Sequence, residues 1–207
     1  MWVKICGITN RDDALAAVEA GADAIGFVLV PTSSRAMTRH AIEEILKVLP
    51  PMVLTVGVTA NENTDYLHGL LRVCSLGAVQ FHGEEPPETV LALKESAKLI
   101  KAIRVKDAHS LEAIPLYRGV DAILLDTYDT QRMGGTGQPF DWNLAVRAKQ
   151  YEIPLIIAGG LNSRNVQEVI KRVQPHGVDV SSGVEVSPGK KSFSLIREFV
   201  LKAKKAV

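Results

Sequence analysis

Two residues of the chain have the chemistry of a proton-transfer pair. Cys6 ends an apolar run near the start of the chain, and Asp126 ends another, after Leu124 and Leu125. A free thiol has a reference pKa of about 8.5, so a modest depression makes it a proton acceptor near neutral pH. Desolvation raises the pKa of a carboxyl group and suits it to donate a proton. The alternatives are a cysteine that only fills space and an aspartate that caps the following turn.

Three polar residues and two glycine-containing turns add possible binding functions. Arg35 follows two serines, and its guanidinium could either hold a planar carboxylate or stay solvated. Gln80 and His82 surround the end of another apolar run, where His82 could be a ligand, a hydrogen-bond partner or an ordinary loop residue. The turns Gly159-Gly160 and Ser181-Ser182-Gly183 expose backbone N–H groups that could converge on a phosphate, or they could simply be tight turns. None of the five histidines has ligand spacing to a cysteine or carboxylate cluster, so no metal site is predicted.

Short, nearly continuous apolar runs must position these residues. Such runs are typical of parallel strands that helices cover from outside. The predicted strands are Trp2–Ile8, Ala24–Val30, Met52–Thr59, Ala78–Phe81, Leu99–Arg104, Ala122–Asp126, Leu155–Ala158 and Val178–Ser181.

The predicted strands are separated by segments whose apolar residues have helical spacing. Asn162 and Ser192 are expected to cap helices, and glycines are expected to end three others. The segment near His109–Tyr117 is the weakest helix, because Pro115 interrupts it. The three helix-ending glycines are Gly21, Gly77 and Gly177.

Eight strands alternating with eight helical segments leave an open doubly wound sheet or a closed (β/α)8 barrel. The units repeat to the end of the chain, and no Gly-x-Gly-x-x-Gly loop follows the first strand. These features favour an α/β protein made of one compact (β/α)8 barrel domain, residues 1–207. In such a barrel the loops that follow the strands carry the chemistry, which brings Cys6 and Asp126 to one rim. Barrels of this type often bind phosphate at the loops after the seventh and eighth strands. This favours phosphate binding at Gly159-Gly160 and Ser181-Ser182-Gly183 over the alternative that they are simply tight turns.

The composition excludes several other classes of function. The chain has 207 residues, 46% of them hydrophobic and 23% charged, and its net charge is +1. This balance gives no reason to expect nucleic acid or a membrane surface as a partner. Two cysteines fit a reducing compartment, and we expect Cys74 to be a buried packing residue. Without a leader sequence or a membrane-length apolar run, the sequence predicts a cytoplasmic protein, a monomer or a homodimer, that acts on a small molecule.

Seven short segments, spread over nearly the whole chain, form a set of motifs. In order they are Lys4-Ile5-Cys6-Gly7-Ile8-Thr9, Gln80-Phe81-His82-Gly83-Glu84, Leu125-Asp126-Thr127, Gly134-Gly135-Thr136-Gly137, Phe140-Asp141-Trp142, Ala158-Gly159-Gly160-Leu161-Asn162 and Asp179-Val180-Ser181-Ser182-Gly183-Val184-Glu185. Together they resemble the phosphoribosylanthranilate isomerase family, the tryptophan-pathway barrel that isomerises N-(5-phosphoribosyl)anthranilate. The combination of the first and last segments is the most specific part of this resemblance.

The resemblance implies an Amadori rearrangement that uses neither a metal nor a cofactor. Asp126 would be the general acid that protonates the ring oxygen, so that the aminosugar opens to a Schiff base. Cys6 would be the general base that takes the proton from C2, and the enolamine would then tautomerise to the ketose. Arg35 would bind the anthranilate carboxylate. The remaining implied contacts are Gln80 and His82 with the substrate and Gly160, Ser182 and Gly183 with its phosphate.

The chain departs from the family pattern beside Arg35. Ser34 and Ala36 stand where the family commonly has a proline and an aromatic residue, which puts the loop geometry in doubt. One rival is the histidine-pathway isomerase, a duplicated half-barrel with an aspartate in place of the first-strand cysteine; this chain shows no half-chain repeat. Ribulose-phosphate epimerase would need metal ligands that are absent here. A rival of a different class is a non-catalytic phosphate-binding barrel, which would bind its ligand without turnover.

Overall fold

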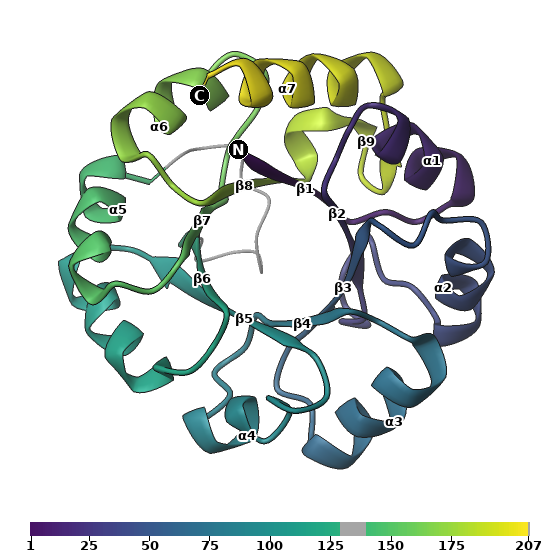
Figure 1. The fold of residues 1–207 in the computed structure, drawn as a ribbon, viewed down its shortest axis with the longest axis horizontal. Helices are drawn as coiled ribbons and strands as arrows, with labels where there is room; N and C mark the ends of the chain where they lie inside the picture. The colour runs from purple at the N-terminus through teal and green to yellow at the C-terminus, as the bar shows by residue number, and fades with distance from the viewer. Residues whose placement is uncertain (129–139, 207) are drawn as a thin grey trace.

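The computed structural model describes residues 1–128 and 140–206 and contains a closed barrel of eight parallel strands (Figure 1). The strands follow one another around the barrel in chain order, and the eighth pairs with the first to close it. The predicted (β/α)8 fold is therefore confirmed. The strands are β1 Trp2–Cys6, β2 Ala24–Val28, β3 Leu54–Thr59, β4 Ala78–Phe81, β5 Lys98–Val105, β6 Ala122–Thr127, β7 Leu155–Ile157 and β8 Gly177–Val180.

Helices lie around the outside of the barrel between successive strands (Figure 1). After β8 the chain forms the short turn η3 Ser182–Val184 and a small hairpin, β9 Glu185–Ser187 and β10 Lys190–Lys191, before the last helix. The other helical segments are α1 Arg11–Glu19, α2 Arg39–Leu46, α3 Thr64–Cys74, α4 Pro87–Leu91, η1 Ala108–Tyr117, α5 Trp142–Ala148, η2 Lys149–Tyr151, α6 Val166–Val173 and α7 Phe193–Lys205. Within the described ranges, no helix is both long and apolar enough to cross a membrane.

Side chains alternate along each strand between the barrel interior and the surrounding helices. On β1, Val3 and Ile5 point outward into the large core beneath the helices. A smaller apolar cluster that includes Ala24, Val56 and Leu124 fills part of the interior. The alternation therefore sends the intervening residues of the strands inward, and several of those towards the carboxyl ends are polar, among them Gln80, Asp126 and Asp179.

The predicted strand boundaries differ from the observed ones by no more than two residues. β1 ends at Cys6 rather than Ile8 because Gly7 turns the chain with a φ of +73°. A methyl group at position 7 would lie 2.5 Å from Cδ of Arg35. Glycine is therefore needed both for the turn and for the passage of the arginine side chain.

Helix ends were predicted less well than strands. Gly21 follows α1 with a φ of +90°, as expected. Gly77 and Gly177 do not end helices: Ser75 and Gln174 adopt the left-handed conformation at the ends of α3 and α6. Residues other than glycine can adopt this conformation. The expectation that glycines end helices therefore placed these two ends two or three residues too far along the chain.

Helix starts gave a mixed result. The Ser192 hydroxyl accepts the N–H of Leu195, so the predicted cap of α7 is confirmed. Asn162 instead makes a separate turn, accepting the N–H of Arg164 at 2.8 Å, and α6 begins only at Val166. The segment around Pro115 is helical but forms the 3-10 helix η1.

Candidate active site

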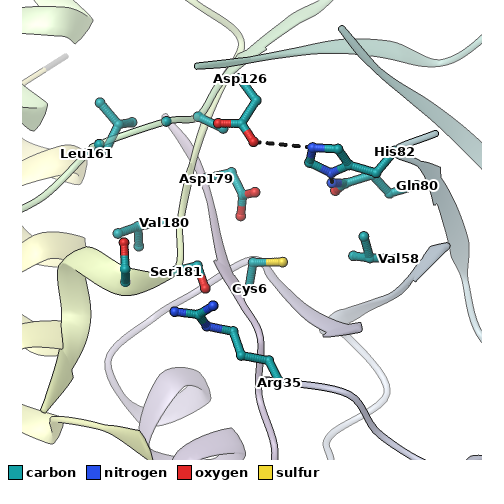
Figure 2. Close-up of a pocket in the computed structure, with 14 residues that line it drawn as sticks. Cys6, Arg35, Val58, Gln80, His82, Asp126, Leu161, Asp179, Val180 and Ser181 are labelled. Atoms are coloured by element: carbon teal, nitrogen blue, oxygen red, sulfur yellow. Dashed lines mark hydrogen bonds and ion pairs between the residues drawn. The ribbon is translucent and has the colours of Figure 1, made fainter. Parts of the chain in front are cut away.

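One pocket opens among the carboxyl ends of the strands and encloses about 610 Å³ of space in contact with solvent (Figure 2). All but one of the predicted site residues line it. Gly183 is the exception. The predicted residues that line the pocket are Cys6, Arg35, Gln80, His82, Asp126, Gly160 and Ser182.

The thiol of Cys6 reaches this pocket from the end of β1. Cys6 pairs in register with Gly26 of β2, where a methyl group would lie only 2.9 Å from Sγ. The residue is 8% exposed. Burial raises the pKa of the Cys6 thiol, and the ammonium of Lys4 opposes this rise without cancelling it. In the free protein the pKa of the Cys6 thiol therefore lies above its ordinary value.

Asp126 reaches the pocket from β6 and uses its two oxygens differently. Oδ1 accepts the backbone N–H of Thr127 at 2.8 Å, which is the turn-capping role considered as an alternative. Oδ2 lies 3.2 Å from Nε2 of His82, but the angle is not that of a hydrogen bond (Figure 2). A methyl group on Gly159 would lie 2.8 Å from Oδ1, so glycine is needed beside the carboxylate. The oxygen that faces the pocket is thus available for proton transfer.

Gln80 and His82 form a linked pair on β4 and its loop. Nε2 of Gln80 lies 3.2 Å from Nδ1 of His82. An amide nitrogen can only donate, so Nδ1 accepts and a neutral His82 carries its proton on Nε2, towards Asp126. Gln80 is 1% exposed, and its Oε1 has no protein partner in the part of the chain described. The pair therefore presents one amide oxygen and one imidazole N–H to the site.

The loops after β7 and β8 pack directly against each other. Gly159 and Gly160 both have positive φ, +77° and +67°. A methyl group on Gly183 would lie 1.9 Å from the carbonyl oxygen of Leu161, so only glycine permits this contact between the two loops. Gly183 thus holds the two loops together, while Gly160 and Ser182 face the pocket.

The alternative that Arg35 is a solvated side chain on an exposed loop is wrong. Its Nε and Nη2 bind the two carboxylate oxygens of Glu185 at 2.8 and 2.6 Å, and its side chain is only 16% exposed. Lys191 binds the same Glu185 at 2.8 Å. Burial alone would raise the pKa of Glu185, but the hydrogen bonds from Arg35 and Lys191 outweigh it and hold the pKa below its usual value. The cluster therefore carries two cations and one anion.

Four further charged residues of the site escaped prediction from the sequence: Lys4, Asp179, Glu185 and Lys191. Nζ of Lys4 lies 3.0 Å from Oδ1 of Asp179, and both residues are buried. Burial alone would lower the pKa of Lys4, but the Asp179 carboxylate outweighs it and keeps the lysine charged. The sequence did contain a signal for two of these residues: Lys4 and Asp179 are charged residues inside otherwise apolar strands, Val3-Lys4-Ile5 and Val178-Asp179-Val180.

Three further features considered in the sequence have different outcomes in the structure. Among residues 1–128 and 140–206, no three His, Cys, Asp or Glu side chains are grouped so that they could hold a metal ion. The glycine-rich segment Gly134–Gly137 lies outside the described residues. Cys74 is 1% exposed at the end of α3, which confirms that it is a packing residue.

Comparisons with known proteins place this site in a family. The chain matches the model of N-(5'phosphoribosyl)anthranilate (PRA) isomerase over residues 3–202. The N-(5'-phosphoribosyl)anthranilate isomerase of Geobacter sulfurreducens is 48% identical over 202 residues, which cover 98% of each chain. A monomer form of the dimeric phosphoribosylanthranilate isomerase from Thermotoga maritima is 40% identical, with a TM-score of 0.90 over 99% of both chains. A phosphoribosyl anthranilate isomerase in complex with reduced 1-(o-carboxyphenylamino)-1-deoxyribulose 5-phosphate is 42% identical, with a TM-score of 0.90 over 99% of both chains. The chain belongs to the N-(5'-phosphoribosyl)anthranilate isomerase family.

Proposed function

We propose that this isomerase of tryptophan biosynthesis converts N-(5'-phosphoribosyl)anthranilate into 1-(2-carboxyphenylamino)-1-deoxyribulose 5-phosphate, with Asp126 as general acid and Cys6 as general base. The observation that carries this assignment is the pocket itself. A carboxylate from β6 and a thiol from β1 line the same cavity from different sides, beside two loops suited to an anion. The reaction redistributes protons and electrons within one molecule, so it requires no redox cofactor.

Ring opening is the first step. The protonated carboxyl of Asp126 gives its proton to the ring oxygen while the bond from that oxygen to C1 breaks. The lone pair of the anthranilate nitrogen forms the C1=N bond of the Schiff base. His82, whose Nε2 lies 3.2 Å from Oδ2, then stabilises the aspartate that has lost its proton.

Proton abstraction is the second step. The thiolate of Cys6 takes the proton from C2, and the electrons of that C–H bond form the C1=C2 bond of the enolamine. The cationic Schiff base accepts these electrons at nitrogen. Tautomerisation moves the hydroxyl proton of C2 away and adds a proton at C1, which gives the ketose. Thiol and substrate carbon must therefore be close, as the position of Cys6 at the end of β1 allows.

Different residues of the pocket rim bind the two substrate anions. Gly160 and Ser182, braced by Gly183, bind the phosphate through backbone N–H groups, as in other barrels of this type. Arg35 binds the anthranilate carboxylate. Since Glu185 occupies its Nε and one Nη2 hydrogen, the carboxylate is bound by the outer N–H groups of the guanidinium, not by the whole fork.

The experiment that tests the function uses purified protein and freshly prepared phosphoribosylanthranilate. The protein should accelerate the loss of substrate fluorescence far above the uncatalysed rate, and the product should co-elute with authentic ketose on chromatography. A ligand that binds at the pocket while fluorescence decays at the uncatalysed rate would reject the proposal and favour the non-catalytic barrel. The sequence-based expectation of a monomer or homodimer stays a prediction.

A further inference from the structure

A buried lysine lies one inward-facing position below the proposed base. Lys4 and Cys6 are two residues apart on β1, so their side chains point into the barrel on the same side of the strand. Lys4 pairs in register with Asp179 of β8 and with Ala24 of β2. Its side chain is fully buried, and its ammonium binds Oδ1 of Asp179 at 3.0 Å. The lysine is thus fixed on one side by an aspartate from the neighbouring strand.

The ammonium of Lys4 and the sulfur of Cys6 both lie beside Gly26 of β2. A methyl group built on Gly26 would lie 2.9 Å from Sγ of Cys6 and 3.1 Å from Nζ of Lys4. Both atoms therefore border the space that a side chain at position 26 would occupy. The missing side chain leaves no atoms of β2 between the positive charge and the thiol.

Stability alone does not account for this lysine. Several other residues of the barrel interior are apolar, among them Val56, Ile100 and Leu124. Burying an ion pair costs desolvation free energy that the attraction only partly offsets, and apolar residues of similar volume often replace such pairs without loss. A charge retained beneath the pocket is therefore better explained by what it does to the pocket.

We propose that Lys4, held in place by Asp179, is a positioning residue that makes the thiolate of Cys6 easier to form for proton abstraction than burial alone would allow. The inference rests on the proposed role of Cys6 as the base. Burial works against the thiolate, and the Lys4 ammonium is the largest effect that opposes it. Asp179 does not touch the reacting atoms in this scheme but sets where the ammonium lies.

Three other charged groups interact with the thiol. Lys191, on β10, favours the thiolate, but its ammonium is bound to Glu185 and to the carbonyl of Ser181. Arg35, on the loop after β2, also interacts electrostatically with the thiol, and its guanidinium is bound to the same Glu185. Asp179 itself disfavours the thiolate. Among these groups Lys4 is the cation whose removal should change the thiol most.

The test measures the thiol directly, by its rate of alkylation with iodoacetamide from pH 5.5 to 10. A Cys74→Ala background leaves Cys6 as the sole cysteine, and a neutral reagent avoids attraction to Arg35. In Lys4→Met the rate at pH 7 should fall about tenfold, which is the fall that a rise of about one unit in the thiol pKa produces. The pH profile of kcat/KM should move upward by the same amount, so that activity partly recovers at high pH.

A matched control comes from the same barrel. Lys101 is also buried and binds Glu85 at 2.8 Å, but it lies on β5, away from the thiol. Lys101→Met should leave the alkylation profile within about twofold. If Lys4→Met fails to fold, the pairs Lys4→Met/Asp179→Asn and Lys101→Met/Glu85→Gln remove both charges of each ion pair and allow the same comparison.

The outcomes separate this inference from the proposed function. An unchanged alkylation profile in Lys4→Met, or an equal shift in the Lys101 control, overturns the inference even when Cys6→Ser is inactive. An active Cys6→Ser variant instead overturns the role of Cys6 as the base, whatever the alkylation profile shows. A shifted thiol profile with a matching shift in kcat/KM supports both.

Discussion

Replacing Glu185 with glutamine tests how Arg35 is held over the pocket. The carboxylate accepts Nε and Nη2 of Arg35 at 2.8 and 2.6 Å, and Nζ of Lys191 at 2.8 Å. Glutamine has the same shape, but its amide nitrogen cannot accept a hydrogen bond. The substitution therefore breaks at least one of these bonds and leaves two cations without their shared anion.

The expected loss of stability follows from burial. Removing one partner of a fully buried ion pair costs about 3–5 kcal/mol. Arg35 keeps 16% of its side chain in solvent, which relieves part of this penalty, so we expect about 3 kcal/mol. For a protein of this size, that free energy corresponds to a fall in Tm of about 6–12 °C.

The effect on function should be selective for the substrate carboxylate. With Arg35 no longer fixed, KM for phosphoribosylanthranilate should rise about tenfold, equivalent to about 1.4 kcal/mol of binding. The kcat should change little, because Cys6 and Asp126 keep their positions. The assay compares inhibition by two reduced product analogues, one with the carboxylate and one without it. Only the carboxylated analogue should bind more weakly.

Glu85→Gln is the matched control, since Glu85 is also buried and binds a lysine. It should lose comparable stability without discriminating between the two analogues. Equal weakening of both analogues in Glu185→Gln would show that Arg35 does not bind the carboxylate. A fall in Tm with unchanged KM would show that the Glu185–Arg35 pair is purely structural.

Three other predictions follow from the geometry of the site and its supports. Asp126→Asn should lower kcat about 1,000-fold at saturating substrate, and an unchanged kcat would assign the acid role elsewhere. Gly183→Ala places a methyl group 1.9 Å from the Leu161 carbonyl and should raise KM more than tenfold, whereas Gly69→Ala, in open space on α3, should add about 0.5–1 kcal/mol of stability and leave kinetics unchanged. Acid should destabilise the protein through Glu85. Burial would raise the pKa of this carboxyl, but Lys101 holds it below the ordinary value of 4.5. A carboxyl with a lowered folded pKa stabilises the fold above its unfolded pKa and loses this contribution as the pH falls. The urea midpoint should therefore drop below about pH 4.5, and a drop equal to that of the wild type in Lys101→Met/Glu85→Gln would contradict this origin.

The sequence was most informative about the strands, because burial on both faces produces continuous apolar runs. All eight runs became strands of the barrel. Helix ends were harder, since Ser75 and Gln174 adopt left-handed conformations that a search for glycine misses. The late start of α6 at Val166 was also hidden, because Asn162 is a good cap by type but makes a turn of its own.

For the site, the sequence indicated which residues would meet but not how they are paired. The end of each strand marked Cys6 and Asp126, and both line the pocket. Contacts across the barrel depend on register, which the sequence does not show. The pairing of Lys4 with Asp179 and the capture of Arg35 by Glu185 join residues 175 and 150 positions apart. The direction of the thiol pKa shift was also hidden from the sequence, because it depends on the burial of Cys6, which outweighs the lysine beside it.

The most direct test of the central claim is the turnover of Cys6→Ser with phosphoribosylanthranilate, measured beside Cys74→Ala. Serine keeps the size of the side chain but is a far weaker acid than a thiol, so it supplies no anionic base at neutral pH. The account predicts that kcat falls by several orders of magnitude in Cys6→Ser, with Tm close to that of the wild type, while Cys74→Ala keeps its rate. A Cys6→Ser enzyme that turns over within about tenfold of the wild type would contradict the account.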